Sequence, residues 1–174
     1  VLADTEPDEV LAMVANRART LTGADVALVA RPDRDDRLTV EIVDGRADAA
    51  STMTSEMLDI VGAWEGQHVP PESVAHDAYR DGVSRVERES ADVLALQTAS
   101  RGSGPAVVIP LVTSDQVLGV LMLLWGDSTR RLPQEATDLA GAFASQAAVT
   151  LLLARALREH ERLAGLNAQL QAQV

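Results

Sequence analysis

Two of the three histidines in this 174-residue chain, His68 and His76, are the first candidates for a haem or metal site. They lie eight residues apart with Pro70 and Pro71 between them. Imidazoles that share a metal from one helix face stand four residues apart, so this pair does not match that pattern. The chain has no cysteine, which excludes disulfides, thiolate zinc sites, iron–sulfur clusters and cysteine nucleophiles. We therefore predict no metal ligands and no catalytic residues.

The charge and hydrophobicity of the chain exclude some classes of binding partner. Fifteen arginines, no lysine and 26 acidic residues give a formal net charge of −11, which argues against binding nucleic acid or an anionic membrane surface. The longest apolar run, Val117–Trp125, has the length of a buried strand, and we expect no membrane contact. The acidic N-terminus lacks the pattern of a signal peptide. These features predict a cytoplasmic location, in a segment of a longer protein.

Periodicity and turn residues predict an α/β fold. A helix is expected over residues 6–22, with Thr5 as its cap, and further helices over 53–64 and from Pro70 to Gly82. Helical spacing also suggests a turn over 91–98, followed by a flexible loop to residue 105. Leu38, Val40 and Ile42 alternate with polar residues and should share the inner face of their strand. The expected strands are residues 24–31 and 37–43 as one hairpin, 83–87, and 106–112 and 117–125 as a second hairpin.

The last predicted helix runs from about Pro133 to Val174 without a further proline. Its 42 residues would span ~60 Å, whereas a domain of this size measures only ~40 Å across. Its far end must therefore project. Apolar residues at three- and four-residue spacing form what we call the exit-helix stripe: Val149, Leu152, Ala156, Leu163, Leu166 and Leu170. The stripe predicts a paired coiled coil, and the alternative is a helix that frays after it leaves the domain. We accordingly divide the chain into a domain over 1–156 and a projecting helix over 157–174.

The order of these elements resembles that of GAF domains, the small-molecule-binding modules of phosphodiesterases, phytochromes and bacterial sensor proteins. The resemblance covers residues 5–160 and is greatest for GAF domains of actinobacterial two-component sensor histidine kinases, including mycobacterial oxygen and redox sensors. It rests on five segments, namely residues 10–18, 21–29, 108–111, 117–121 and 139–148. It implies a GAF-like, PAS-related antiparallel sheet flanked by helices, with a long C-terminal exit helix.

The same resemblance implies a regulatory, non-enzymatic function. Such a domain would bind a small ligand or partner, form a homodimer through its N-terminal and exit helices, and pass the signal to a kinase core in the same parent chain. The alternative is a ligand-free dimerisation or interaction module of a transcription regulator or phosphatase. His160 does not serve as a phosphoacceptor in this interpretation, because the proline that normally follows that histidine is missing.

The resemblance also indicates where a ligand would lie. Trp64, His76 and Tyr79 fall in the segments that hold ligands against the sheet in GAF domains, although they could equally fill that space or, for His76, lie on the surface. Gly119 within a strand indicates a bulge or a close approach of backbone or ligand. The cofactor stays unknown: the loop that carries the haem histidine in relatives has none here, no cysteine can attach a bilin, and the cyclic-nucleotide signature is missing.

Overall fold

The computed structural model describes residues 7–45, 54–89, 93, 104–127, 129 and 131–173. The predicted cap at Thr5 and most of the predicted turn and loop over 91–105 lie outside these residues. The other predicted elements are present, with bounds shifted by a few residues. They are α1 (Pro7–Thr22), β1 (Val26–Pro32), β2 (Leu38–Gly45), α2 (Ser55–Gly62), α3 (Val74–Asp81), β3 (Arg85–Glu87), β4 (Ala106–Val112), β5 (Val117–Leu124) and α4 (Gln134–Ala172).

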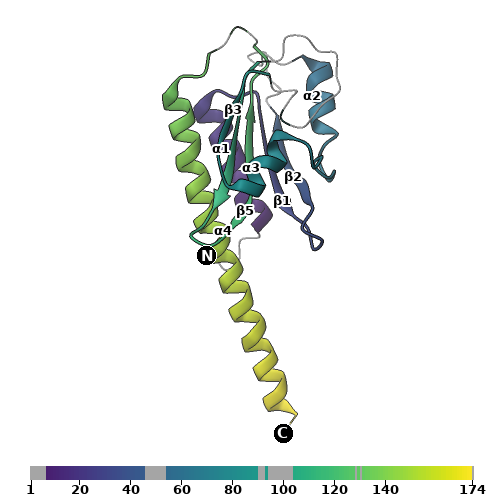
Figure 1. Ribbon diagram of the computed structural model, residues 1–174. Coiled ribbons are helices and arrows are strands. Elements are labelled where there is room, and N and C mark those ends of the chain that lie inside the picture. The colour runs from purple at the N-terminus through teal and green to yellow at the C-terminus, as the bar shows by residue number, and fades with distance from the viewer. Residues whose placement is uncertain are drawn as a thin grey trace.

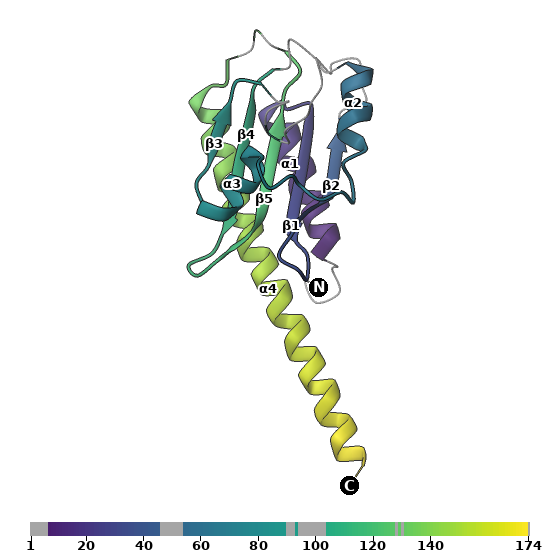
Figure 2. The same cartoon turned by 45° about the vertical axis from the view of Figure 1, so that its right-hand side comes forward.

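The strands form one five-stranded antiparallel sheet in the order β2-β1-β5-β4-β3. Helices α1 and α4 cover one face, and α2 and α3 lie over the other (Figures 1 and 2). The two central strands, β1 and β5, are covered on both sides, which explains why their sequences are almost continuously apolar. This architecture confirms the predicted fold class.

Two hydrophobic cores, one on each face, hold these layers together. The α1/α4 core takes alternate strand residues such as Val29, Leu121 and Leu123, together with Trp125. The α2/α3 core takes the residues between them, such as Leu28, Val120 and Met122. Strand side chains alternate between faces, so one continuous apolar run supplies both cores.

One prediction for β2 is wrong, because the strand contains a bulge. Val29 pairs with Ile42 but Ala30 pairs with Val40, so Glu41 is an extra residue in β2. The bulge moves Ile42 to the opposite face from Leu38 and Val40, where it packs against the α1/α4 core. The Glu41 carboxylate instead forms an ion pair with the Arg31 guanidinium, at an N–O distance of 2.7 Å.

Helix α3 has a well-defined beginning and end. The Ser73 hydroxyl accepts a hydrogen bond from the His76 backbone N–H at 3.2 Å, as an N-cap does. Gly82 ends the helix with φ of 70°, a left-handed conformation that glycine adopts without strain. These caps fix the helix that carries His76 and Tyr79.

Helix α4 is continuous over 39 residues, which corresponds to about 58 Å. Its last buried residue is Ala154, and from there the helix extends away from the sheet (Figure 1). By length and composition alone α4 could cross a membrane, although polar residues interrupt its apolar sequence. One third of that apolar window is buried in the described structure, where its small residues pack against α1 and β4.

Candidate ligand site and pairing surface

His76 and Tyr79 come together on α3, as their spacing along a helix allows. Their rings form an edge-to-face contact with centroids 6.2 Å apart. The Tyr79 hydroxyl donates a hydrogen bond of 2.7 Å to Asp36 in the β1–β2 turn. Burial, this hydrogen bond and the charge of Asp36 raise the pKa of Tyr79 to about 12. Tyr79 therefore ties α3 to the turn and stays protonated at neutral pH.

The ring of His76 contains a polar atom that sequence reasoning could not identify. Its Nδ1 is buried and has no hydrogen-bond partner among the described residues. Buried polar atoms normally have a partner in the protein or in ordered solvent. A ligand or water that reaches the His76 ring could therefore bond to Nδ1.

The other two predicted ligand residues occupy different surroundings. Trp64 follows α2 and is partly buried against the α2/α3 core, against which Tyr79 also packs. Gly119 lies within β5, where a Cβ atom would come 2.4 Å from the backbone oxygen of Ala30. The space beside Gly119 is thus taken by the backbone of β1, and the pairing of β5 with β4 also shifts at Leu118, next to Gly119. Two of the three explanations that the sequence left open, a bulge and a close approach of backbone, therefore apply.

His68 contacts the β1–β2 hairpin. It follows α2 in a segment that forms a bridge with β2, and its Nδ1 is 3.0 Å from the Thr39 hydroxyl and 3.8 Å from Asp33. Within the described residues, no three histidine or acidic side chains gather in a way that could hold a metal ion.

The exit-helix stripe lies on the surface. Val149, Leu152, Leu163, Leu166 and Leu170 expose between 42% and 66% of their surface, and Ala156 is also exposed. Helix α1 packs beside α4 and exposes Met13 and Leu21. Large apolar side chains exposed in this number on adjacent helices are typical of a protein–protein interface.

A family model described as "GAF domain" matches residues 4–151. The chain belongs to the GAF domain family. Among solved structures, it is similar to the GAF-B domain of DevS from Mycobacterium smegmatis, with 31% identity over 89% of this chain and 99% of that one and a TM-score of 0.68. A structure of the second GAF domain of DevS from the same organism gives 30% identity, the same coverage and a TM-score of 0.69.

A more distant structure supports the fold alone. The GAF domain/HD domain protein from Geobacter sulfurreducens is 17% identical over 88% of this chain and 95% of that one, with a TM-score of 0.69. The family match and the similarity to GAF domains of DevS from Mycobacterium smegmatis confirm the resemblance drawn from the sequence. GAF domains are typically non-catalytic, and helix α4 continues beyond the matched region.

Proposed function

We propose that this GAF domain is a regulatory, sensory module of a two-component sensor histidine kinase, located in the cytoplasm. It would form a homodimer through α1 and α4 and transmit a change in the domain along α4 to a kinase core in the same parent chain. The similarity to the DevS GAF domains supports this class of parent protein.

The observation that carries the proposal is the exposed stripe beyond Ala154. Full burial of a leucine stabilises by about 1.5–3 kcal/mol, and Leu163, Leu166 and Leu170 expose 49%, 43% and 62% of their surface. Pairing would therefore contribute roughly half of that value per leucine on each helix. All three leucines come after Ala154, the last residue of α4 that the described part of the domain buries.

A rigid helix also suits the relay of a signal. Residues 134–154 pack against α1 and the sheet, so a small rotation of the sheet would turn the whole helix. Paired helices have discrete packing arrangements, and a turn of one helix changes which residues meet across the pair. The proposed kinase core would then receive the signal as a change in the rotational orientation of α4.

The proposed ligand would contact the α3 side of the domain. His76 supplies an unpartnered Nδ1, and Tyr79 and Trp64 supply aromatic surface beside the same core. These three side chains offer few polar groups and so do not specify one ligand.

A second function, a dimerisation module without a ligand in a transcription regulator or phosphatase, is favoured by one observation. Apolar side chains from α2, α3 and the sheet fill the α2/α3 core, and two pockets that open on the described surface do not include Trp64, His76 or Tyr79. The two functions share the pairing helices and differ in whether the α3 side binds a small molecule.

The relay is tested by fusing residues 1–174, in continuous helical phase, to the dimerisation and ATP-binding domains of a histidine kinase. Insertion of one heptad after Glu161 should retain the autophosphorylation rate of the fusion, because seven residues restore the phase of the stripe. Insertion of four residues at the same place should change that rate several-fold. Equal rates for the four- and seven-residue insertions would overturn the relay.

A further inference from the structure

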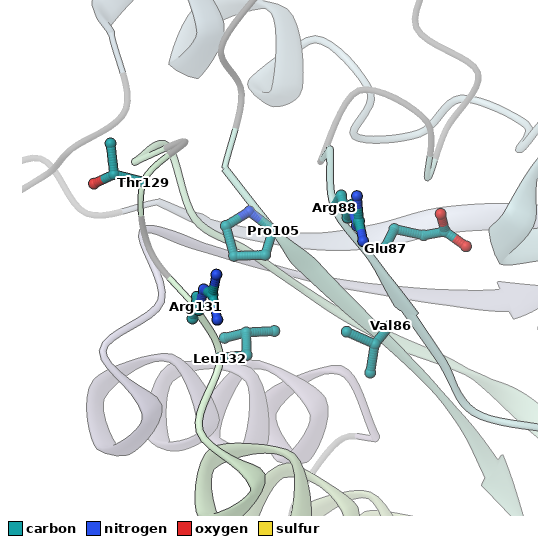
Figure 3. Close-up of a pocket in the computed structure, with 7 residues that line it drawn as sticks. All are labelled: Val86, Glu87, Arg88, Pro105, Thr129, Arg131 and Leu132. Atoms are coloured by element: carbon teal, nitrogen blue, oxygen red, sulfur yellow. The ribbon is translucent and has the colours of Figure 1, made fainter.

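A pocket of about 540 Å³ lies where the free edge of the sheet meets the segment that leads into α4 (Figure 3). Ligand sites commonly enclose about 300–1,000 Å³. Its lining comes from β3 and the residue after it, from the residue before β4, and from the β5–α4 connection. The lining residues are Val86, Glu87, Arg88, Pro105, Thr129, Arg131 and Leu132.

Strand register places this pocket on the opposite face of the sheet from His76 and Tyr79. Val86 pairs with Val107, and Val107 belongs to the α1/α4 core. Leu132 packs against the same core. Val86 and Leu132 point toward one another, with Pro105 nearby, and form an apolar wall (Figure 3).

The polar part of the lining is cationic. Arg88 and Arg131 are exposed, and neither forms an ion pair or hydrogen bond in the part of the chain that the structure describes. Glu87 pairs with Ala106, which faces the α2/α3 core, and its carboxylate is directed away from Pro105 and Leu132 (Figure 3). The two guanidinium groups are therefore not neutralised from within the pocket.

Within the described residues, Arg88 and Arg131 place two arginines without an acidic partner at one pocket, although the chain has a net charge of −11. Guanidinium groups bind carboxylates through charge-assisted hydrogen bonds, whereas the Thr129 hydroxyl already donates to the Asp127 carboxylate at 2.7 Å. The apolar wall favours a ligand with a hydrocarbon or aromatic body over a fully hydrated inorganic anion.

We propose that this pocket binds a small organic carboxylate with an apolar body, held by Arg88 and Arg131 and packed against Val86, Pro105 and Leu132. The site is separate from the proposed ligand position on α3, and its occupation does not depend on pairing of α4. A ligand here would join the edge strand to the residues that immediately precede the exit helix.

The test uses benzoate as the probe and follows the backbone amide NMR signals of residues 1–174. Benzoate should give saturable shifts at Val86, Arg88 and Leu132, with a dissociation constant on the order of 1 mM, typical of a small ligand in an open site. Benzamide, which has the same ring but no charge, should bind at least ten-fold more weakly. Arg88→Gln and Arg131→Gln should each weaken benzoate binding roughly ten-fold.

Arg34→Gln is the matched control, because Arg34 is also exposed and lies in the β1–β2 turn, away from the pocket. It should leave benzoate affinity unchanged. If a variant fails to fold, the unchanged chain still tests the proposal. Its affinity for benzoate must fall as the NaCl concentration is raised, because salt screens the attraction between carboxylate and arginine. Equal binding of benzamide, tighter binding of inorganic phosphate, an equal effect of Arg34→Gln, or no saturable shift up to the solubility limit would each overturn the proposal.

Discussion

Gly119 and Gly141 offer two identical substitutions with opposite expected effects on stability. In Gly119→Ala the new Cβ would lie 2.4 Å from the Ala30 backbone oxygen and 3.1 Å from Cγ of Arg31. Ordinary van der Waals contact begins near 3.4 Å, so β1 or β5 must move by about 1 Å. Both strands lie at the centre of the sheet and are buried on both faces, which leaves little room for that shift.

Overpacking of this kind costs about 1–3 kcal/mol of unfolding free energy. For a domain of this size each kcal/mol lowers the melting temperature by about 2–4 °C, so Gly119→Ala should lower it by roughly 2–12 °C. A Cβ at Gly141 meets nothing within 4 Å. Gly141→Ala should therefore raise the unfolding free energy by about 0.5–1 kcal/mol, since alanine favours the helix.

The assay is thermal and urea unfolding of both variants beside the unchanged chain. If Gly119→Ala is as stable as the unchanged chain or more stable, the close approach of the β1 backbone to Gly119 is refuted. In that case the ligand explanation for Gly119 would regain support, and the variant should then be compared for ligand binding.

Two further predictions concern buried polar groups. Asp25 is 2% exposed and accepts a hydrogen bond of 2.8 Å from the Gly126 N–H, so Asp25→Ala should lower the unfolding free energy in urea by about 1.5–3 kcal/mol; a loss below about 0.5 kcal/mol would show that this bond contributes little. Tyr79 is the only tyrosine, so the ultraviolet absorbance of tyrosinate reports its ionisation alone, with an expected midpoint of about 12, which Asp36→Asn should lower. Because the folded-state pKa exceeds the ordinary 10.0, the stabilisation from protonated Tyr79 is fully present below pH 10 and is lost as the pH rises through 12. A midpoint of 10 in the folded chain would contradict the Asp36 contact.

Most elements of the fold could be predicted because each depends on local sequence. Alternation or continuous apolar runs identify the strands, and Ser73, Gly82 and Gly23 mark helix ends through the conformations they adopt. The β2 bulge could not be predicted, since Glu41 continues the alternating pattern and only pairing with β1 shows that one residue is extra. The sequence identifies Gly119 as unusual, but the backbone of β1 beside it and the extra residue at Leu118 are seen only from the pairings of β5 with β1 and β4.

The candidate sites depend on contacts between distant segments, which a single sequence does not specify. Tyr79 and Asp36 are 43 residues apart and meet only because α3 packs over β4 and β5, within reach of the β1–β2 turn. Arg88 and Arg131 come together because β3 takes the edge position next to β4, near the start of α4. The exit-helix stripe was predictable, because helical periodicity alone places its residues on one face.

Pairing of α4 is tested most directly by sedimentation equilibrium of residues 1–174 over a range of concentrations. The unchanged chain should have a mass of twice 18.5 kDa. Leu166→Glu should shift the chain to the monomer, because a buried charge replaces an apolar contact in both helices. Ala168→Glu, at an exposed position of the same helix outside the stripe, should remain a dimer. A monomer of 18.5 kDa at all concentrations, or equal behaviour of the two variants, would contradict a paired exit helix.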